Sequence, residues 1–587
     1  MNFFKTVLAT MVGLVISGFV LMFLGFVLVA GIVASASSDE APIVSSNSVL
    51  YINLSGQVSE RLAEDPFAEA FGDENRGIEL LATLDAIESA KTDPNIEGIY
   101  IENGYLSAGF ASLEEIRSAL DDFKSTGKFV YAYGEYYTEA NYYVSSVADE
   151  IYLNEQGTIE LNGLSANITF FKGLFDKLEI EPKIFKVGTY KSAVEPFSRK
   201  DMSDANREQV SSFLNDIYGN YLLKVSESRN IPIEKLKSIS DSMLVRKAED
   251  ALEFGLVSKL AYKDLVKSEI KSALDYEDTS KKIKFISLKK YIKRAQADAE
   301  YSSNKVAVIV AEGEIVSGKG ESTNVGSAKF VKAIRQARES KRVKAVVIRV
   351  NSPGGGLMAS DVMWREIMLT KAEKPVIASM SAVAASGGYY LSMPCDTIVA
   401  QPTTITGSIG IFGMLFDMSG FLESKLGITH DVVKTGDFSD IYTVTRPLND
   451  YETSIIQSQV EKGYDLFTGK AAEGRNMDID ELKKYAEGRV WTGSQAKERG
   501  LVDILGSYKD AVQIAATKAG IEEDYAITLY PELKSEFEEI LERMVGESEA
   551  RFMKSEYGEM TKYLEKIKDL ENLKGIQARL PFDMEIK

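Results

Sequence analysis

Short apolar runs alternate with amphipathic stretches along the chain, and this alternation predicts strands that are connected by helices. In the second half, strands are predicted at Val306–Val310, Ala345–Val350 and Pro375–Met380, and helices at Ser327–Glu339 and about Leu357–Thr370. The first of these helices is predicted because apolar residues return at helical spacing, as Phe330 and Ile334 do. The strand that starts at Ala345 is apolar except at Arg349. Alternation of this kind indicates an α/β fold with a mainly parallel sheet.

The first half repeats this order of elements, with a strand predicted at Gly98–Ile101 and a helix at Ser112–Phe123. Four short segments of the first half also resemble segments of the second half, most of them at a nearly constant spacing. The pairs are Ser48–Ile52 with Lys305–Ile309, Tyr142-Tyr143 with Tyr389-Tyr390, Lys177–Ile180 with Lys425–Ile428, and Gly188–Lys191 with Gly436–Ser439. Agreement at four separated places predicts a duplication. We therefore expect two tandem repeat domains, at residues 47–300 and 301–525.

Before the repeats, the stretch from Val7 to Val33 contains no charged residue. It is long enough to cross a hydrocarbon core of about 30 Å as a helix. Lys5 precedes it, so the positive-inside rule predicts a cytoplasmic N-terminus and a transmembrane anchor within residues 1–34, and then a linker at 35–46. Cleavage at Ala34-Ser35-Ala36 is the alternative, but the apolar region of a signal peptide runs only about 7–15 residues. An uncleaved anchor with both repeats outside the cytoplasm is expected.

After about Glu522 the composition changes, and residues 526–587 are expected to form a charged C-terminal extension. From Glu536 to Lys574 this extension is rich in charge and has apolar residues at helical spacing. It predicts a helix or helices that pack on the domains or on a neighbouring subunit. A solvated helix without a function is the default interpretation.

The overall composition excludes several kinds of function. A net charge of −19 argues against a nucleic-acid partner, because phosphate binding needs clustered Lys and Arg. The single cysteine, Cys395, allows no intrachain disulfide, and the single histidine, His430, rules out a His-rich metal site. A Ser-His-Asp triad would have to use His430, which we expect to lie partly exposed in a loop or at the edge of a strand at Val432-Val433. Neither a metal nor a cofactor is expected.

Two turns of the second repeat combine small residues with candidate chemistry. Asn351–Gly356 follows a predicted strand, and its glycines allow the backbone to turn sharply with N–H groups directed at a ligand. Ser386 follows the next strand and precedes two glycines at the start of a helix. The N–H of Gly387 is a candidate oxyanion donor, and the turn at Gly354-Gly355 is a candidate for the second donor. A tight connection and a helix cap are the purely structural alternatives.

The first repeat lacks both turns and offers Lys191 instead. Its corresponding segments, Glu102–Tyr105 and Glu139–Tyr143, contain neither the glycine run nor the serine. Lys191 would act as a general base for Ser386 if burial at a domain interface lowered its pKa, and a surface lysine is the alternative. The hydroxyl of Ser408 could orient the neutral amine, although a role in a turn is as plausible. These residues predict one active site that is divided between two repeats.

In combination, Lys191 in GTYKSAVEPF, Ser386 in ASGGYY, the NSPGG loop and TGSIGIFG resemble the signal peptide peptidase A (protease IV) family in its long, duplicated form. The resemblance covers roughly residues 47–525 and includes the membrane anchor. It implies a Clp-protease/crotonase-like fold, a Ser-Lys dyad, and a homotetramer that degrades leftover signal peptides. By motif match it assigns Ser386 as the nucleophile, Lys191 as the general base and Ser408 as the residue that hydrogen-bonds the lysine.

The sequence thus predicts a serine endopeptidase, anchored in the inner membrane with its catalytic domains in the periplasm, that cleaves extended apolar peptides through an acyl-enzyme. Two other classes of protein stay open. A crotonase-type acyl-CoA enzyme would share the fold and the oxyanion loops, although an exported location offers no obvious supply of CoA. A non-catalytic membrane scaffold would need neither Ser386 nor Lys191.

Overall fold

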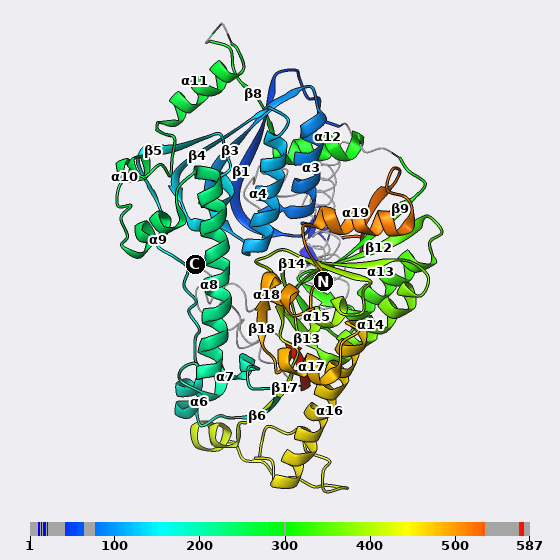
Figure 1. Cartoon of the computed structure of the whole chain (residues 1–587). Helices are drawn as coiled ribbons and strands as arrows, with labels where there is room; N and C mark the ends of the chain where they lie inside the picture. Colours follow the sequence, from blue (N-terminus) through cyan, green and yellow to red (C-terminus); the bar gives the residue numbers. More distant parts are fainter. Residues whose placement is uncertain are drawn as a thin grey trace.

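The structure is a computed structural model, and it describes residues 10, 11, 13, 16–18, 20, 41–63, 77–276, 278, 280–298, 301–533 and 575–579. Within these residues, each repeat contributes one large sheet, and a smaller sheet joins the two repeats. The sheet of the first repeat lies in the upper part of Figure 1 and the second repeat in the lower part, where residues 172–198 of the first repeat also lie. The long helix α8 (Asp204–Arg229) runs from the first repeat down beside the second.

The sheet of the first repeat has the order β2-β1-β3-β4-β5-β7, with β8 also paired to β1, and all its pairings are parallel. Its strands are β1 (Ser48–Ser59), β2 (Ile78–Glu79), β3 (Ile96–Ser107), β4 (Phe129–Tyr137), β5 (Glu150–Ile159), β7 (Lys259–Leu260) and β8 (Lys284–Ser287). The crossover helices are α3 (Leu80–Thr92), α4 (Phe110–Lys124) and α5 (Glu139–Ser145). The later helices are α6 (Lys172–Leu178), α7 (Glu195–Ser198), α8, α9 (Ile233–Asp241), α10 (Ala248–Glu253), α11 (Lys263–Ala273) and α12 (Leu288–Asp298).

The sheet of the second repeat has the order β18-β16-β14-β12-β9-β20, with β15 paired to β14 and β19 to β15. Only the β16–β18 pairing is antiparallel among the described strands of this sheet. Its strands are β9 (Lys305–Glu312), β12 (Val343–Ser352), β14 (Val376–Ala385), β15 (Thr397–Ala400), β16 (Ile405–Gly407), β18 (Val490–Thr492), β19 (Ile504–Leu505) and β20 (Ala526–Tyr530). The helices are α13 (Ser327–Glu339), α14 (Leu357–Lys371), α15 (Gly387–Ser392), α16 (Asp450–Gly474), α17 (Ile479–Tyr485), α18 (Gly493–Glu498) and α19 (Tyr508–Ala519).

The order of elements confirms the predicted α/β fold with parallel sheets. The run β1-β3-β4-β5 of the first repeat has the same order along the sheet as β9-β12-β14-β15 of the second. Helices α4 and α5 follow their strands as α14 and α15 do in the other copy. The predicted helix Ser327–Glu339 is observed with those bounds, whereas strands β12 and β14 each extend beyond their apolar runs into the turns that follow.

A third, smaller sheet has the order β11-β10-β13-β21-β17-β6 and combines segments that are far apart in the sequence. Strand β6 (Glu181–Val187) comes from the first repeat, and β21 (Gly575–Arg579) comes from the C-terminal segment. The other strands are β10 (Glu314–Val316), β11 (Asn324–Gly326), β13 (Gly354–Gly356) and β17 (Ile411–Asp417). This sheet therefore brings the first repeat against the second on the side where β12 and β14 end.

The two repeats also share a buried interface around Arg349, the one charged residue of strand β12's apolar run. Successive residues of a strand face opposite sides, and Val346 and Ile348 pack in the core under α13 and α14, while Ala345 and Val347 belong to the core that α19 shares with the first repeat. Arg349 falls on the second of these faces, and its guanidinium is fully buried.

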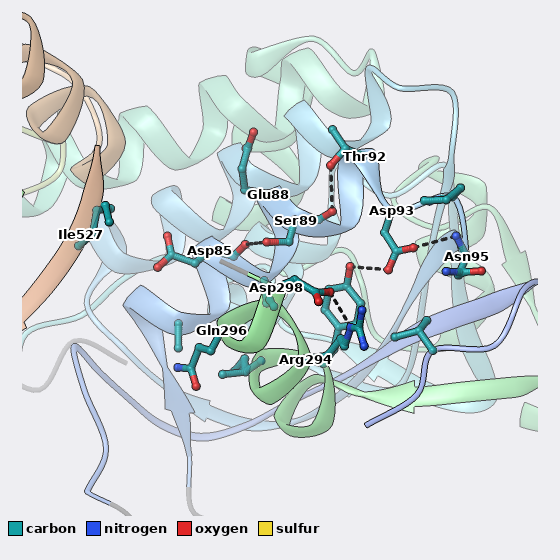
Figure 2. Close-up of a pocket in the computed structure, with 18 of the residues that line it drawn as sticks. Asp85, Glu88, Ser89, Thr92, Asp93, Asn95, Arg294, Gln296, Asp298 and Ile527 are labelled. Atoms are coloured by element: carbon teal, nitrogen blue, oxygen red, sulfur yellow. Dashed lines mark hydrogen bonds and ion pairs between the residues drawn. The ribbon is translucent and has the colours of Figure 1, made fainter. Parts of the chain in front are cut away.

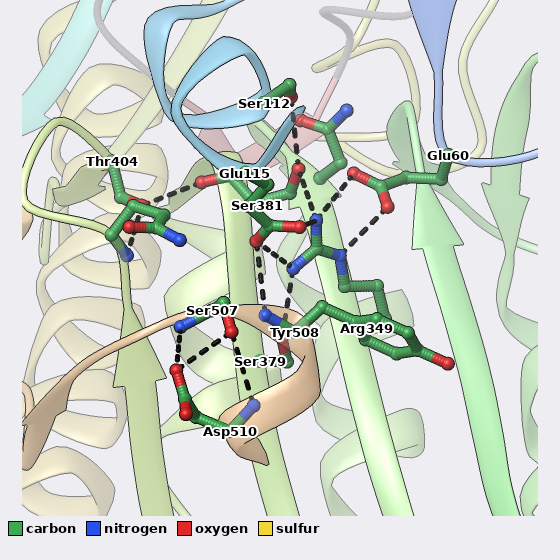
Figure 3. Close-up of polar contacts among 12 residues, drawn as sticks. Glu60, Ser112, Glu115, Arg349, Ser379, Ser381, Thr404, Ser507, Tyr508 and Asp510 are labelled. Atoms are coloured by element: carbon green, nitrogen blue, oxygen red, sulfur yellow. Dashed lines mark hydrogen bonds and ion pairs between the residues drawn. The ribbon is translucent and has the colours of Figure 1, made fainter. Parts of the chain in front are cut away.

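The guanidinium of Arg349 is satisfied by two carboxylates of the first repeat (Figure 3). It donates to Glu60 at 2.8 Å and to Glu115 at 2.9 Å, and it also donates to the hydroxyls of Ser379 and Ser381 at 3.0 Å. The ring of Tyr508 lies 5.5 Å from the guanidinium carbon. A charge in an otherwise apolar strand is thus explained by an ion-pair network between the repeats.

The predicted terminal segments are described only in part. The predicted anchor, Val7–Val33, lies mostly outside the described residues, as do the predicted helices within Glu536–Lys574. Among the residues with assigned positions, none forms a helix that is both long and apolar enough to span a bilayer. Strands β20 and β21, which come from residues 526–587, are integrated into sheets of the second repeat rather than separate from it.

Candidate active site

Ser386 lies at the junction between strand β14 and helix α15, in a strained backbone conformation. Its φ of 56° is in the left-handed region, which non-glycine residues adopt rarely and mostly where the surrounding structure enforces it. Two backbone hydrogen bonds hold Ser386 in this conformation. Its N–H donates to the carbonyl of Gly407 at 2.8 Å, and its carbonyl accepts from the N–H of Tyr390 at 2.9 Å. The hydroxyl is therefore held at the end of a central strand, and the residue is fully buried.

The glycine turn lies next to Ser386 because β12 and β14 are adjacent parallel strands that end at the same edge of the sheet. Gly354 has a φ of 97°, and a Cβ at this position would collide with the backbone nitrogen of Gly387. The two predicted oxyanion turns thus pack directly against each other. The N–H of Gly354 itself donates to the hydroxyl of Ser352 at 3.2 Å.

Lys191 reaches this site from the first repeat through strand β6. Strand β6 pairs antiparallel with β17 along its whole length, from Glu181 opposite Asp417 to Val187 opposite Ile411. The chain then turns at Gly188, and the N–H of Tyr190 donates to the carbonyl of Glu487 at 3.0 Å. This pairing with the second repeat carries Lys191 to the end of β14.

The amine of Lys191 contacts both predicted serines. Its Nζ lies 2.9 Å from Oγ of Ser386 and 3.0 Å from Oγ of Ser408, and it also donates to the Ser408 carbonyl at 3.2 Å. A fourth partner is the carbonyl of Arg579 on strand β21. Ser408 has a φ of 50°, and its N–H donates to the carbonyl of Arg489 at 2.7 Å. The structure therefore places the amine of Lys191 within hydrogen-bonding distance of the hydroxyls of both Ser386 and Ser408.

The charge state of Lys191 follows from its burial. The side chain is fully buried, and the ring centroid of Phe412 lies 6.0 Å from Nζ. Desolvation lowers the pKa of the Lys191 amine well below its usual range. No carboxylate of the described residues pairs with it, so no opposite charge raises the pKa back. The lowered pKa favours the unprotonated amine, which is the form that a general base requires.

Two glycines that we did not predict make room for Lys191. A Cβ at Gly488 would lie only 2.7 Å from Cβ of Lys191, and one at Gly410 would lie 3.3 Å from its Cδ. Gly488 also has a φ of 76°. In the sequence, Gly488 is a lone glycine after a helix, and nothing local connects it to a lysine almost 300 residues away.

The corresponding turns of the first repeat contain an amide network in place of a nucleophile. Asn141 Nδ2 donates to the carbonyl of Leu54 and to Oδ1 of Asn103, each at 3.3 Å. The hydroxyl of Ser145 donates to the same Asn103 oxygen at 3.1 Å. These polar groups hydrogen-bond to one another, which agrees with a structural role for this end of the first sheet.

His430 does not take part in the site. It is exposed in residues 427–434, which have no regular secondary structure, so the strand predicted at Val432-Val433 is not observed. The side chains of this segment are solvated because its neighbours do not cover them, and Val433 is 98% exposed. Among the described residues, His, Cys, Asp and Glu form no group of three or more that could hold a metal ion.

A pocket of about 1140 Å³ lies elsewhere, between α3, α12 and β20 (Figure 2). Its polar lining includes Asp85, Asp93 and Arg294, and burial raises the pKa of Asp85 to about 6. The pocket contains none of the residues around Ser386. Two of its acidic groups have partners, since Asp93 accepts from the hydroxyl of Tyr291 at 3.0 Å and Asp298 pairs with Arg294 at 2.5 Å. We assign no chemistry to it.

Comparison with known proteins identifies similar sequences. The profile of peptidase family S49 matches residues 122–277 and 368–522, one segment in each repeat. Protease 4 of Haemophilus influenzae is 36% identical over 529 residues, which cover 86% of this chain and 85% of that protein. Protease 4 of Salmonella typhi is 38% identical over 476 residues, which cover 80% of this chain and 76% of that protein.

Two further comparisons extend beyond bacterial Protease 4. The chloroplastic serine protease SPPA of Arabidopsis thaliana is 36% identical over 493 residues, which cover 83% of this chain and 71% of that protein. A solved structure of ClpP1 from Listeria monocytogenes aligns with 35% of this chain and 94% of its own, at 14% identity and a TM-score of 0.24.

Proposed function

The chain belongs to peptidase family S49, and on this premise we propose that it is a membrane-anchored serine endopeptidase with a Ser386–Lys191 dyad. The observation that carries the proposal is the distance of 2.9 Å between Nζ of Lys191 and Oγ of Ser386, with both side chains fully buried. A buried, neutral amine is the base that this serine needs, since the one histidine lies in an exposed loop.

The reaction runs through two acyl-transfer steps. Ser386 Oγ attacks the carbonyl carbon of the peptide bond while the Lys191 amine accepts the hydroxyl proton. The developing oxyanion is stabilised by backbone N–H groups at Gly387 and at the Gly354-Gly355 turn. The C–N bond then breaks, and the lysine ammonium gives its proton to the leaving amine. A water molecule, deprotonated by the same lysine, hydrolyses the ester and regenerates Ser386.

Ser408 orients the amine in this mechanism. Its hydroxyl and its carbonyl both lie within hydrogen-bonding distance of Nζ, at 3.0 Å and 3.2 Å. They fix the direction of the amine, so that its lone pair is directed at the hydroxyl of Ser386.

The substrates are extended, apolar peptides, and leftover signal peptides are the class that the family resemblance favours. An extended peptide would bind by adding a strand to the edges at β13 and β17, which flank the dyad. Val7–Val33 anchors the chain in the inner membrane with the catalytic domains in the periplasm, where cleaved signal peptides are within reach.

The protein assembles as a homo-oligomer, a tetramer by the same resemblance. Residues 426–442 expose large apolar side chains that a monomer would leave in water, namely Leu426, Ile428, Val432, Val433, Phe438 and Tyr442. Several exposed apolar side chains on one segment are typical of a subunit interface. The segment extends from the lower end of the molecule in Figure 1.

The proposed dyad is tested by labelling with a fluorophosphonate, a probe that reacts with an activated serine, at several pH values. We expect labelling of the wild type, no labelling of Ser386→Ala, and a loss of about 10²–10⁴-fold in labelling rate for Lys191→Met. The same variants are assayed for cleavage of a synthetic signal peptide. Labelling and cleavage by Lys191→Met at the wild-type rate would exclude the lysine as the base.

Lys186→Met is the matched control, because Lys186 lies on the same strand, β6, but is exposed. It should behave as the wild type does in both assays. Turnover of an acyl-CoA that survives Ser386→Ala would instead favour a crotonase-type enzyme.

A further inference from the structure

Strand β21 runs through the groove between the glycine turn and β17, next to the catalytic side chains. On one side it pairs antiparallel with β13, where Arg579 faces Gly354 and Gln577 faces Gly356. On the other side it pairs antiparallel with β17, where Gln577 faces Phe412. Strands β13 and β17 are joined in this sheet only through β21 among the described strands. The groove therefore holds one extended chain, and here that chain is the protein's own C-terminal segment.

The backbone of β21 contacts the groups that would act on a substrate. The amine of Lys191 donates to the carbonyl oxygen of Arg579. A Cβ at Gly387 would lie 3.1 Å from the carbonyl oxygen of Ala578, and a Cβ at Gly354 would collide with that oxygen. The carbonyl group of Ala578 thus lies against the two proposed oxyanion turns, and the carbonyl group of the next residue, Arg579, lies against the proposed base.

The side chains of β21 fix its register in the groove. The methyl group of Ala578 is fully buried in the apolar core of the second repeat. The guanidinium of Arg579 pairs with Glu314 of β10 at 3.4 Å, and both side chains are largely buried, with exposed fractions of 14% and 18%. A shift by one residue would place Gln577 or Arg579 in the space that encloses the methyl group, so this one register is favoured.

We propose that β21 is a tethered, uncleaved ligand of the peptide groove that competes with peptide substrates and keeps the site closed until it leaves. The proposal rests on the peptidase function argued above. A substrate peptide that adds a strand between β13 and β17 needs the same hydrogen-bonding edges, so it and β21 exclude each other. A tethered competitor raises the apparent KM and leaves kcat unchanged, because it lowers only the fraction of molecules whose groove is open.

The first test compares the full chain with a variant that lacks residues 575–587. If the tethered strand has an effective concentration of about 1 mM and an affinity on the order of 0.1 mM, its removal lowers the apparent KM for a peptide about tenfold. The matched control lacks only residues 584–587, which keeps β21 and the peptide bond after Arg579, and it should retain the wild-type KM. An equal KM for all three proteins would overturn the proposal.

A point substitution in the full chain covers the case in which the truncated protein does not fold. Ala578→Trp places an indole where the methyl group is enclosed, so the strand can no longer occupy the groove. It should lower the apparent KM as the truncation does, with kcat unchanged. A wild-type KM for this variant would count against the tethered ligand.

A binding measurement separates this proposal from the peptidase function. A fluorescently labelled peptide with the sequence of residues 575–580, GIQARL, is titrated against proteins that carry Ser386→Ala. We expect about tenfold tighter binding when residues 575–587 are absent than when they are present. This difference in affinity would support β21 as a tethered ligand even if no variant cleaved peptides. Equal affinities together with normal peptide cleavage would overturn the tethered-ligand proposal and leave the proposed peptidase function standing.

The intact mass of the purified full-length protein tests whether the enzyme cleaves its own β21 segment. A mass that includes all residues to Lys587 agrees with an uncleaved ligand. A chain that ends at Ala578, formed by the wild type but not by Ser386→Ala, would make the segment a substrate and overturn its role as a competitor.

Discussion

At the scale of single residues, the site depends on what burial does to a lysine. Lys191 has four hydrogen-bond acceptors around its amine, and none of them is a charged carboxylate. Hydroxyls and carbonyls can hold the amine in place without the charge that would keep it protonated. The local sequence shows a lysine after a tyrosine, and nothing in it distinguishes this buried amine from a solvated one.

The lowered pKa of Lys191 predicts the pH dependence of the reaction. In the proposed mechanism the neutral amine is the active form, so kcat/KM should fall on the acid side of the Lys191 pKa, by about tenfold per pH unit. Because burial lowers this pKa, the plateau should be reached well below the ordinary lysine value of about 10.4. The measurement is kcat/KM for a peptide as a function of pH. Lys191→Met is the control, and its residual kcat/KM should lack the fall on the acid side.

The same shift predicts the pH dependence of stability. Between the folded-state pKa and the higher unfolded-state pKa, the unfolded chain binds a proton that the folded chain does not. The contribution of Lys191 to the free energy of unfolding therefore rises with pH in this window and is lost as pH falls through the folded-state pKa. Lys191→Met removes this dependence, so a wild-type slope in the variant would contradict the assignment.

At the scale of elements, the site exists because β6 of the first repeat completes a sheet of the second. The β6–β17 pairing carries Lys191 to the end of β14, and the turn at Gly488 leaves space for it. Parallel strands β12 and β14 bring the glycine turn and Ser386 to one edge. The helices and strands near these turns were predictable from apolar periodicity, whereas the strand exchange between repeats was not, since pairing partners leave no local pattern.

A substitution at Gly488 tests this arrangement of elements. Gly488→Ala would place a methyl group 2.7 Å from Cβ of Lys191, so the lysine must move. A displacement of about 1 Å at a catalytic group costs about 100-fold in rate, and we expect a loss of that size in kcat.

The control for Gly488→Ala is Gly520→Ala. Gly520 has a similar positive φ of 65°, but a Cβ there meets nothing within 4 Å. Both variants strain the backbone, so only a displaced lysine distinguishes them. Equal activities for the two variants would show that Gly488 does not position Lys191.

At the scale of the whole molecule, the two repeats form one unit through a shared core and the Arg349 network. Strand β12 packs against α13 and α14 on one face, and its other face belongs to the core that α19 shares with the first repeat. Neither repeat holds both Ser386 and Lys191, so neither should be active alone. Burial raises the pKa of the Glu115 carboxyl, and the charge of Arg349 is the main opposing influence.

Removing Arg349 tests how far the network supports this unit. Arg349→Met leaves the carboxylates of Glu60 and Glu115 buried without their counter-charge, and we expect a loss of about 3–5 kcal/mol in the free energy of unfolding. The measurement is the midpoint of urea denaturation. Adding Glu60→Gln and Glu115→Gln to the variant should restore part of the loss, because the uncompensated charges are then gone.

Arg199→Met provides the control on the surface. Arg199 pairs with Asp201 at 3.2 Å, but both side chains are largely solvated. Its loss should change the free energy of unfolding by less than about 1 kcal/mol. A similar small change for Arg349→Met would show that the buried network does not hold the repeats together.

The sequence by itself determined the α/β class, the duplication and the candidate residues Ser386, Lys191 and Ser408, because apolar periodicity, repeated segments and short motifs are local properties. Only the tertiary structure decided that Lys191 lies 2.9 Å from Ser386, that Gly488 makes room for it, and that β21 fills the adjacent groove. These contacts join segments hundreds of residues apart, and burial, which sets the pKa of Lys191, arises only when both repeats pack around it.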